Sequence, residues 1–266
     1  MTWDPELYAR YDSHRARPFL DLVARVHAEE PRTVADLGCG TGVLTESLTR
    51  RWPGARVEGI DSSPEMVARA VAPPDGNARF RVRLGDLREW RASGTDVVVS
   101  NAALQWVPEH RDLLRAWAAE LAPGAWLAWQ VPGNFAAPSH ALLRELAESP
   151  RWSRRLPLRS RPGWLGDALR GTATVDDPAG YARLLLDAGC TADVWETTYL
   201  HLLQGPDPVL NWVRATALRP IAGLLDAGDL AAFEAEYAAL LREAYPPGPH
   251  GTLFPFRRIF CVGRRN

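Results

Sequence analysis

Between residues 33 and 132, short apolar runs alternate with amphipathic stretches. This alternation is typical of βαβ units, in which parallel strands form one sheet and helices cover its faces. Five strands are predicted in this region, over Thr33–Leu37, Arg56–Ile60, Phe80–Leu84, Val97–Asn101 and Trp126–Val131. The pattern therefore predicts an α/β fold with a mostly parallel sheet.

Helices are predicted between these strands, because apolar residues recur there at helical spacing. Leu44 and Leu48 indicate one helix, Pro64 suits the first turn of another, and Trp117 and Leu121 belong to a third. The apolar faces at this spacing are expected to face the core.

The second half of the chain is predicted to add helices and two more strands. Helices are expected near Ala179–Ala188, Pro208–Ala217 and Asp229–Ala244, and strands near Thr191–His201 and Phe256–Val262. A strand pair that follows βα units and is joined by inserted helices indicates one elaborated domain rather than two.

The basic residues exclude several kinds of chemistry. All 31 residues counted as Lys and Arg are arginine, because the sequence contains no lysine. A phosphate-binding P-loop and Schiff-base or pyridoxal-phosphate catalysis need a lysine amine, so these classes are excluded. With 32 acidic residues the formal charge is −1, which provides no overall attraction to nucleic acid or to an anionic membrane.

Cysteine usage and targeting signals both bear on the compartment. Cys39, Cys190 and Cys261 are too few and too far apart for a disulfide framework, and no Cys/His cluster offers a metal site. The sequence shows no secretory signal, and no apolar run approaches the roughly 18 residues of a membrane span. We therefore expect a soluble, reduced, cytoplasmic protein without a metal.

The strongest local signal is the segment VADLGCGTG, residues Val34–Gly42. It places Asp36 at the end of a strand and three glycines, Gly38, Gly40 and Gly42, in the turn into a helix. Glycines here let the backbone approach a ligand, and the start of the helix supplies unpaired N–H groups. The dinucleotide fingerprint G-x-G-x-x-G is not met, because Val43 stands where its last glycine or alanine would be.

Three acids narrow the choice of ligand. Asp36 precedes the glycines, where a carboxylate repels a pyrophosphate but accepts a hydrogen bond from an ammonium group. Asp61 ends the second strand, where a carboxylate can accept from both hydroxyls of a ribose. Asp86 follows the third strand, within reach of an adenine amino group. A ligand with an amine, a carboxylate and a ribose therefore fits best.

The pattern D-x-G-x-G-x-G, followed by Asp61 and Asp86, resembles the class I S-adenosylmethionine-dependent methyltransferases. The resemblance implies a Rossmann-like fold with a seven-stranded, mostly parallel sheet, an antiparallel last strand, helices on both faces and inserted helices. It implies S-adenosylmethionine as cofactor and S-adenosylhomocysteine as product. The cofactor-binding residues that it implies are Asp36, Gly38, Gly40, Thr41, Asp61, Ser62, Met66, Asp86, Leu87, Asn101 and Ala102.

Segments from nearly the whole chain resemble the trans-aconitate 2-methyltransferase family within that class. They are LYARYDSHRARP (Leu7–Pro18), SNAALQWVPEH (Ser100–His110), WETTYLH (Trp195–His201), WVRATALRP (Trp212–Pro220) and FPFRRIFCV (Phe254–Val262). The match is least clear from Ser149 to Asp177. The resemblance implies methyl-ester formation on a small tricarboxylate.

A carboxylate acceptor needs no general base, because it is already ionised near neutral pH. Holding a trianion calls for arginine, whose guanidinium binds carboxylates in a fork. Arg219, in an otherwise apolar stretch, is the first candidate for such a clamp. Gln105 and Trp106, after the fourth strand, would supply an amide donor and an aromatic wall. The alternatives are a structural ion pair for Arg219, and loop packing of Trp106 beside a surface Gln105.

Further candidates come from both ends of the chain, with a solvated or core role open for each. Tyr199 is a weaker candidate for the substrate side. Strand alternation sends Arg257 and Arg258 to opposite faces, so at most one of them can serve the substrate. The N-terminal segment is predicted to cover the site with Tyr8, Tyr11, His14, Arg15 and Arg17.

The segment Pro150–Pro162 is rich in arginine. It contains no acidic residue and no clear period, and its basic residues are Arg151, Arg154, Arg155, Arg159 and Arg161. It is predicted to be a mobile surface loop that is solvated or draws in an anionic substrate. Binding to nucleic acid phosphates is a weaker hypothesis, because the patch is short and the chain is slightly negative.

The expected organisation is a single methyltransferase domain in four parts. Residues 1–30 form a helical cover, 31–132 the cofactor-binding core, 133–190 an insertion with the arginine-rich loop, and 191–266 the last strands and substrate-side helices. A small anionic carboxylic acid is the expected partner, without nucleic acid or membrane, in a monomer or weak homo-oligomer. Another small-molecule or carrier-bound acid, or a non-catalytic cofactor sensor, remains open.

Overall fold

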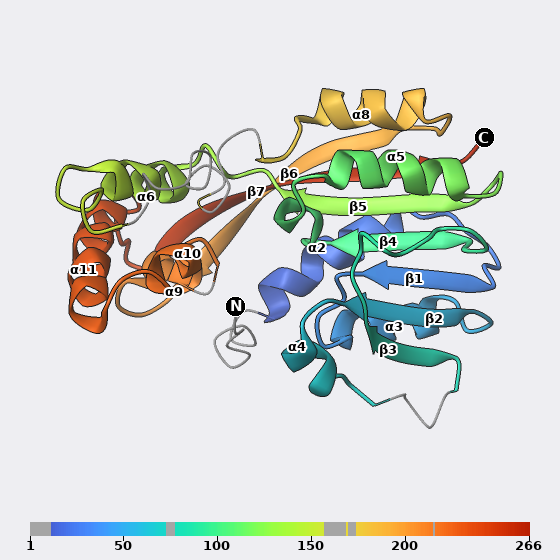
Figure 1. Ribbon diagram of the computed structural model, residues 1–266, viewed down its shortest axis with the longest axis horizontal. Helices are drawn as coiled ribbons and strands as arrows, with labels where there is room; N and C mark the ends of the chain where they lie inside the picture. Colours follow the sequence, from blue (N-terminus) through green and yellow to red (C-terminus); the bar gives the residue numbers. More distant parts are fainter. Residues whose placement is uncertain (1–11, 73–77, 157–168, 170–173, 215) are drawn as a thin grey trace. The chain divides into compact units, whose positions relative to one another are not determined.

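The computed structural model describes residues 12–72, 78–156, 169, 174–214 and 216–266 (Figure 1). The chain divides into two compact units. We call residues 1–132, 176–197 and 258–266 the sheet unit, and residues 133–175 and 198–257 the helical unit. Each unit is described by itself.

A seven-stranded sheet forms the centre of the sheet unit, with the strand order β3-β2-β1-β4-β5-β7-β6. The first five strands pair in parallel, and β7 pairs antiparallel with β5. The strands are β1 (Thr33–Leu37), β2 (Arg56–Asp61), β3 (Phe80–Leu84), β4 (Val97–Asn101), β5 (Trp126–Pro132), β6 (Asp193–Leu203) and β7 (Thr252–Arg264). The predicted fold class is confirmed, and each of the first five strands agrees with its predicted bounds to within one residue.

The strand order reverses between β1 and β4, which places a switch point at the carboxyl ends of these strands. In open α/β sheets, ligands bind in the crevice outside such a point. The central strands β1, β4 and β5 are buried along almost their whole length, as expected for parallel strands covered on both faces.

Helices pack on this sheet, as the apolar spacing predicts. Contacts join α2 to β5 and β4, α3 to β2, α4 to β3, and α5 to α8. The elements are α2 (Asp12–Ala24), α3 (Val43–Arg51), α4 (Pro64–Ala68), α5 (His110–Glu120), α8 (Pro178–Asp187) and the short 3-10 helix η2 (Leu104–Trp106). Within the described part of the chain, no helix is long and apolar enough to cross a bilayer.

The helical unit contains four described helices and the outer parts of β6 and β7. They are α6 (Pro138–Glu148), α9 (Pro208–Arg214), α10 (Arg219–Ala222) and α11 (Ala227–Ala244), and α11 contacts both α6 and α9. The sequence does not predict α6, although Pro138 suits its first turn and Leu143, Leu146 and Ala147 are buried on one side. Tyr237 of α11 donates from its hydroxyl to the carbonyl of Ser139, which ties the two helices together.

Residues 150–156, the described part of the arginine-rich segment, are not the solvated loop that its composition predicts. Over residues 150–156, Trp152 is fully buried and packs edge-to-face on Phe233 of α11, with the ring centroids 5.1 Å apart. Its indole N–H donates to Glu236 Oε2 at 2.8 Å. This part of the segment is therefore anchored to the core of the helical unit.

Acids of α11 also hold two of the arginines in this segment. Arg151 pairs with Glu236, and Arg155 Nε lies 3.2 Å from Asp229 Oδ2. For residues 150–156 the prediction was wrong, because the segment has no acid of its own and the acids that pair with it come from a helix about 80 residues further along the chain. Arg154 is exposed, and Arg159 and Arg161 lie outside the described residues.

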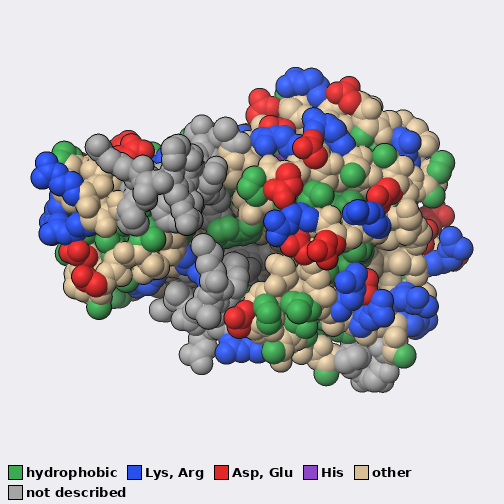
Figure 2. Space-filling view, in the orientation of Figure 1, with side chains coloured by type: hydrophobic (Ala, Val, Ile, Leu, Met, Phe, Trp, Pro, Cys, Tyr) green, Lys and Arg blue, Asp and Glu red, His purple; other side chains and the backbone are tan. Residues whose placement is uncertain are grey.

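Charges of both signs are mixed on the surface that Figure 2 draws, where arginine and acidic side chains interleave. In the sheet unit, Glu58 Oε1 lies 2.6 Å from Arg81 Nη2 and 2.9 Å from Arg83 Nε. Exposed pairs of this kind contribute only about 0 to 1 kcal/mol each.

Candidate functional site

The turn between β1 and α3 brings the backbone to the switch point. Gly38, Gly40 and Gly42 all adopt left-handed conformations, with φ of 79°, 60° and 76°, which glycine adopts without steric cost. A Cβ at Gly38 would overlap Ala103, and one at Gly42 would come within 2.6 Å of Val82 Cγ2. A Cβ at Gly40 would meet no atom of the described residues within 4 Å. Gly40 therefore borders the open space that a ligand can enter.

Asp61 holds this turn from the end of β2. Its Oδ2 accepts from the N–H of Gly40 at 2.8 Å, and its Oδ1 accepts from the N–H of Ser63 at 2.9 Å. Each carboxylate oxygen has a second lone pair, so hydroxyl groups can still donate to the same carboxylate. Asp61 is thus oriented before any ligand arrives.

Asp36 is buried beneath the turn and is 2% exposed. Its Oδ2 accepts from Thr45 Oγ1 at 2.5 Å, while no described residue donates to Oδ1. Burial raises the pKa of Asp36 to about 7, opposed by the Thr45 hydrogen bond and reinforced by the charge of Asp61. A cation or an N–H donor near Oδ1 would favour the charged carboxylate.

Asp86 and its neighbours lie after β3. Arg88 donates to Asp86 from its side chain and its backbone N–H, which keeps the pKa of Asp86 below its usual value. Leu87 is buried beside it. Asp86 is therefore a firmly ionised acceptor whose carboxylate is shared with an arginine.

The end of β4 forms the other side of the switch point. Ser100 Oγ donates to the carbonyl of Leu37 at 2.8 Å, which links β4 to the end of β1. Asn101 Oδ1 accepts from Gln130 Nε2 of β5 at 2.6 Å. Ala102 has a φ of 56°, a strained value for a residue with a Cβ.

The structure brings most of the predicted cofactor residues to one sheet edge. Because β3, β2, β1 and β4 are neighbours, Asp86, Asp61, Gly38 and Asn101 follow one another along their carboxyl ends. Thr41 lies in the glycine turn, Ser62 is exposed after Asp61, and Met66 is buried in α4. Binding by each of these residues stays a prediction.

Gln105 does not fit the alternative of a surface residue, and its role as an amide donor toward the substrate stays a prediction. It is only 6% exposed, so it is not a surface residue, and its Nε2 donates to the carbonyl of Ala102 at 2.5 Å. The short helix η2 turns this side chain back onto the strand end, which no local pattern indicates. Trp106, the last residue of η2, is half-buried.

The other substrate-side candidates fall in both units. In the sheet unit, Arg17 is exposed on α2 with its Nε 3.8 Å from Asp21 Oδ2. In the helical unit, Arg219 is half-buried at the start of α10, and Tyr199 is buried with its ring stacked on His201 at 6.3 Å. Tyr8, Tyr11 and the side chains of His14 and Arg15 lie outside what the structure describes.

The two arginines of β7 separate as strand alternation predicts. Arg257 is half-buried in the helical unit and donates from Nη1 to the carbonyl of Gly133 at 3.0 Å. Arg258 is 5% exposed in the sheet unit and donates from Nη1 to Gln130 Oε1 at 3.1 Å.

Thr45 and Gln130 are site residues that the sequence analysis missed. Both are fully buried. Gln130 is a polar residue in the otherwise apolar strand β5, and that mismatch is the signal that could have indicated it.

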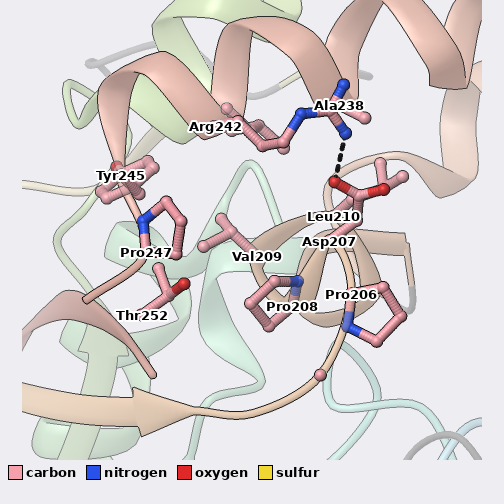
Figure 3. Close-up of a pocket in the computed structure, with 12 residues that line it drawn as sticks. Pro206, Asp207, Pro208, Val209, Leu210, Ala238, Arg242, Tyr245, Pro247 and Thr252 are labelled. Carbon is pink, nitrogen blue, oxygen red and sulfur yellow. Dashed lines mark hydrogen bonds and ion pairs between the residues drawn. The ribbon is translucent and has the colours of Figure 1, made fainter. Parts of the chain in front are cut away.

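A cavity of about 430 Å³ lies in the helical unit, between the start of α9 and the end of α11 (Figure 3). Its wall is largely apolar, with Val209, Leu210 and Tyr245 among its lining residues, and Arg242 Nη1 lies 2.5 Å from Asp207 Oδ1 beside it. Its described lining contains none of the predicted site residues.

The sequence is similar to known proteins over most of its length. Residues 9–196 match a family model described as a methyltransferase domain. The chain is 53% identical over 270 residues to a trans-aconitate 2-methyltransferase of Streptomyces avermitilis, covering 99% of this chain and 97% of that protein. It is also 53% identical over 264 residues to one of Rhodococcus jostii, covering 98% and 99%.

Solved structures share the fold at low sequence identity. The YcgJ protein from Bacillus subtilis matches with a TM-score of 0.55 at 17% identity, over 95% of this chain and 99% of that one. The plantazolicin methyltransferase BpumL, solved with SAH, matches with a TM-score of 0.52 at 14% identity, over 98% and 91%. On its sequence and its fold, the chain belongs to the class I S-adenosylmethionine-dependent methyltransferases, in the family of the trans-aconitate 2-methyltransferases.

Proposed function

We propose that this protein transfers the methyl group of S-adenosylmethionine to a carboxylate of trans-aconitate, which yields a methyl ester and S-adenosylhomocysteine. The observation that carries this proposal is the 53% identity to relatives of that name over nearly the full length of both chains. The carboxyl edge of β3, β2, β1 and β4 supports it, because acids and an open glycine follow each other there.

The residues at this edge fit the cofactor. Gly40 leaves open space at the turn, and the buried Asp36 Oδ1 has no donor among the described residues. Asp61 would hold the ribose, Asp86 and Leu87 the adenine, and Asp36 would face the amino end. When bound, the cofactor supplies a methyl group activated by a sulfonium.

The protein's part in the reaction is to position the reactants and exclude water. A carboxylate oxygen of the acceptor forms the new C–O bond as the C–S bond breaks, and the electron pair of that bond stays on sulfur. No proton moves, so no general base is required. Holding the two reacting atoms in line about 3 Å apart supplies several kcal/mol of the rate enhancement.

Arginine is the residue expected to hold the acceptor's other carboxylates. Arg219 remains the first candidate, with Gln105, Trp106, His14, Arg17 and Tyr199 as further substrate-side residues. A small anionic acid as partner, a monomer or weak homo-oligomer, and a cytoplasmic location complete the proposal.

The test is methyl transfer from radiolabelled cofactor to a panel of acids: trans-aconitate, cis-aconitate, citrate and a long-chain fatty acid. We expect the highest kcat/KM with trans-aconitate and a base-labile product. Arg219→Ala should raise the KM for a tricarboxylate by about tenfold or more and hardly affect a monocarboxylate. Turnover confined to the fatty acid would refute the proposal.

A further inference from the structure

Three buried or half-buried polar side chains on neighbouring strands of the sheet unit form one hydrogen-bonded chain. The strands β4, β5 and β7 lie side by side, and Gln130 in β5 is fully buried between its neighbours. Arg258 Nη1 of β7 donates to Gln130 Oε1 at 3.1 Å, and Gln130 Nε2 donates to Asn101 Oδ1 of β4 at 2.6 Å. We call Arg258, Gln130 and Asn101 the amide relay.

The arginine determines the direction of this relay. A guanidinium has only donors, so Gln130 must turn its oxygen toward Arg258 and its NH2 group toward Asn101. Asn101 must then accept with its oxygen, which leaves its own NH2 group for another partner. If the Gln130 amide were flipped, N–H groups would face each other at Arg258 Nη1.

The free end of the relay lies at the switch point. Asn101 is half-buried at the carboxyl end of β4. Ser100, the residue before it, donates a hydrogen bond to the carbonyl of Leu37 at the end of β1. No described residue accepts a hydrogen bond from Asn101 Nδ2. The strand end is held in place because the N–H of Ala102 donates to the carbonyl of Gln130 at 3.0 Å.

We propose that Arg258 and Gln130 are positioning residues that hold Asn101 with its NH2 group toward the reacting acceptor, and that this selects a carboxylate as the methyl acceptor. An amide N–H donates a hydrogen bond to a carboxylate oxygen and stabilises it. A substrate that is methylated on an amine or a hydroxyl carries an N–H or O–H group, which instead needs an oxygen of the protein to accept its hydrogen bond. The inference rests on the proposed function and explains why the site would methylate a carboxylate rather than an amine or a hydroxyl.

Gln130→Glu tests the direction of the relay with almost no change in shape. A carboxylate at position 130 accepts from Arg258 and also from Asn101, so Asn101 must turn its NH2 group inward and present its oxygen. We expect the KM for trans-aconitate to rise by about tenfold or more, with a smaller fall in kcat. Because the relay assigns the Asn101 side chain to the acceptor and not, as the family resemblance implies, to the cofactor, the Kd for S-adenosylhomocysteine, measured by calorimetry, should change by less than about threefold.

Arg258→Met provides a second variant should Gln130→Glu fail to fold. It removes the donor that directs Gln130, so both amides can adopt either orientation, and the KM for trans-aconitate should rise by a smaller factor. Arg264→Met is the matched control, because Arg264 is an exposed arginine of the same strand. It should leave KM, kcat and the Kd for S-adenosylhomocysteine at their wild-type values.

A readout independent of turnover separates this inference from the proposed function. In 15N-labelled protein with S-adenosylhomocysteine, the side-chain NH2 resonances of Asn101 are identified by their loss in Asn101→Asp. They should shift when trans-aconitate is added to the wild type, and should not shift in Gln130→Glu. A wild type that shows the shift but no methyl transfer would refute the proposed function and support the relay.

Two outcomes would overturn the relay. One is an unchanged KM for trans-aconitate in both Gln130→Glu and Arg258→Met. The other is a rise in the Kd for S-adenosylhomocysteine by as large a factor as the rise in the KM for trans-aconitate. That result would mean that these residues support the fold or the cofactor site.

Discussion

Thr45 Oγ1 of α3 donates a hydrogen bond to Asp36 Oδ2 of β1 at 2.5 Å, inside a part of the sheet unit where Asp36 is 2% exposed. This single donor does not offset the burial of the carboxylate, so the pKa of Asp36 is raised to about 7. The acid at the head of the glycine turn therefore titrates near neutral pH in the protein without ligand.

The raised pKa of Asp36 makes the stability of the ligand-free protein depend on pH. Between its unfolded value of 3.8 and its folded value of about 7, the folded protein keeps a proton that the unfolded chain loses, so this group lowers the free energy of unfolding as pH rises. Asp36→Asn removes that loss. In urea unfolding, the free energy of unfolding of the variant should exceed that of the wild type by about 1 to 4 kcal/mol at about pH 8, and by almost nothing at about pH 4.

A stability difference between the Asp36→Asn variant and the wild type that stays the same at both pH values would contradict this account. Asp96, which accepts from the backbone N–H of Arg32 and Thr33 at a more exposed position, offers the control. Asp96→Asn should not reproduce the gain at high pH.

Replacing Gly40 by alanine is expected to affect mainly cofactor binding, whereas replacing Gly42 by alanine is expected to affect mainly thermal stability. Both have positive φ, so each variant bears a backbone cost of about 1 kcal/mol. At Gly42 the new Cβ also meets Val82, whereas at Gly40 it enters open space. Gly40→Ala should weaken S-adenosylhomocysteine binding with a small fall in Tm, and Gly42→Ala should show the larger fall in Tm.

These two quantities are measured by calorimetry and by thermal unfolding on the same samples. If Gly40→Ala bound S-adenosylhomocysteine as tightly as the wild type, Gly40 would not border the cofactor.

Asp61→Asn is expected to weaken the cofactor complex. The substitution removes the charge and turns a donor toward either Gly40 or Ser63, whose N–H groups Asp61 now accepts from at 2.8 and 2.9 Å. We expect the Kd for S-adenosylhomocysteine to rise by about 10-fold to 100-fold in isothermal calorimetry.

Ser63→Ala is the matched control, because Ser63 caps α4 by accepting from the N–H of Met66 at 3.3 Å. It should lower the free energy of unfolding by about 0.5 to 2 kcal/mol and leave the Kd nearly unchanged. An equal loss of affinity in both variants would mean that Asp61 acts only by shaping the turn.

Trp152→Ala should destabilise the protein by about 3 to 5 kcal/mol, because it removes a fully buried side chain and leaves a cavity against Phe233. Arg154→Ala, at an exposed position of the same segment, should stay within about 0.5 kcal/mol of the wild type. Denaturant unfolding measures both. Equal free energies of unfolding for the two variants would mean that Trp152 is not anchored in the core and that this segment is the surface loop that its composition predicts.

Local patterns were enough to predict the sheet and the glycine turn. The strands Thr33–Leu37, Phe80–Leu84 and Val97–Asn101 are confirmed with their predicted bounds, because each is a short apolar run between turn residues. The left-handed turn at Gly38, Gly40 and Gly42 follows from the same kind of local signal. The family resemblance rests on these elements and on the acids that end the strands.

The helical unit was harder to predict. The helix α6 was not predicted. Residues 150–156 of the arginine-rich segment were wrongly predicted to be solvated, since Trp152 and Arg155 contact residues of α11 far along the chain. Composition describes the charge of a segment but not the residues that will pack against it.

The sequence by itself therefore determined the fold class, the cofactor turn and the chemical class of the ligand, because apolar periodicity and glycine conformations act over a few residues. Only the tertiary structure decided that Gln105 turns inward, that Asp36 is buried with one oxygen unpaired among the described residues, and that Arg258 reaches Asn101 through Gln130. These contacts join residues on different strands and helices. Their energies depend on burial and on the direction of hydrogen bonds, and both are set only when the sheet has formed.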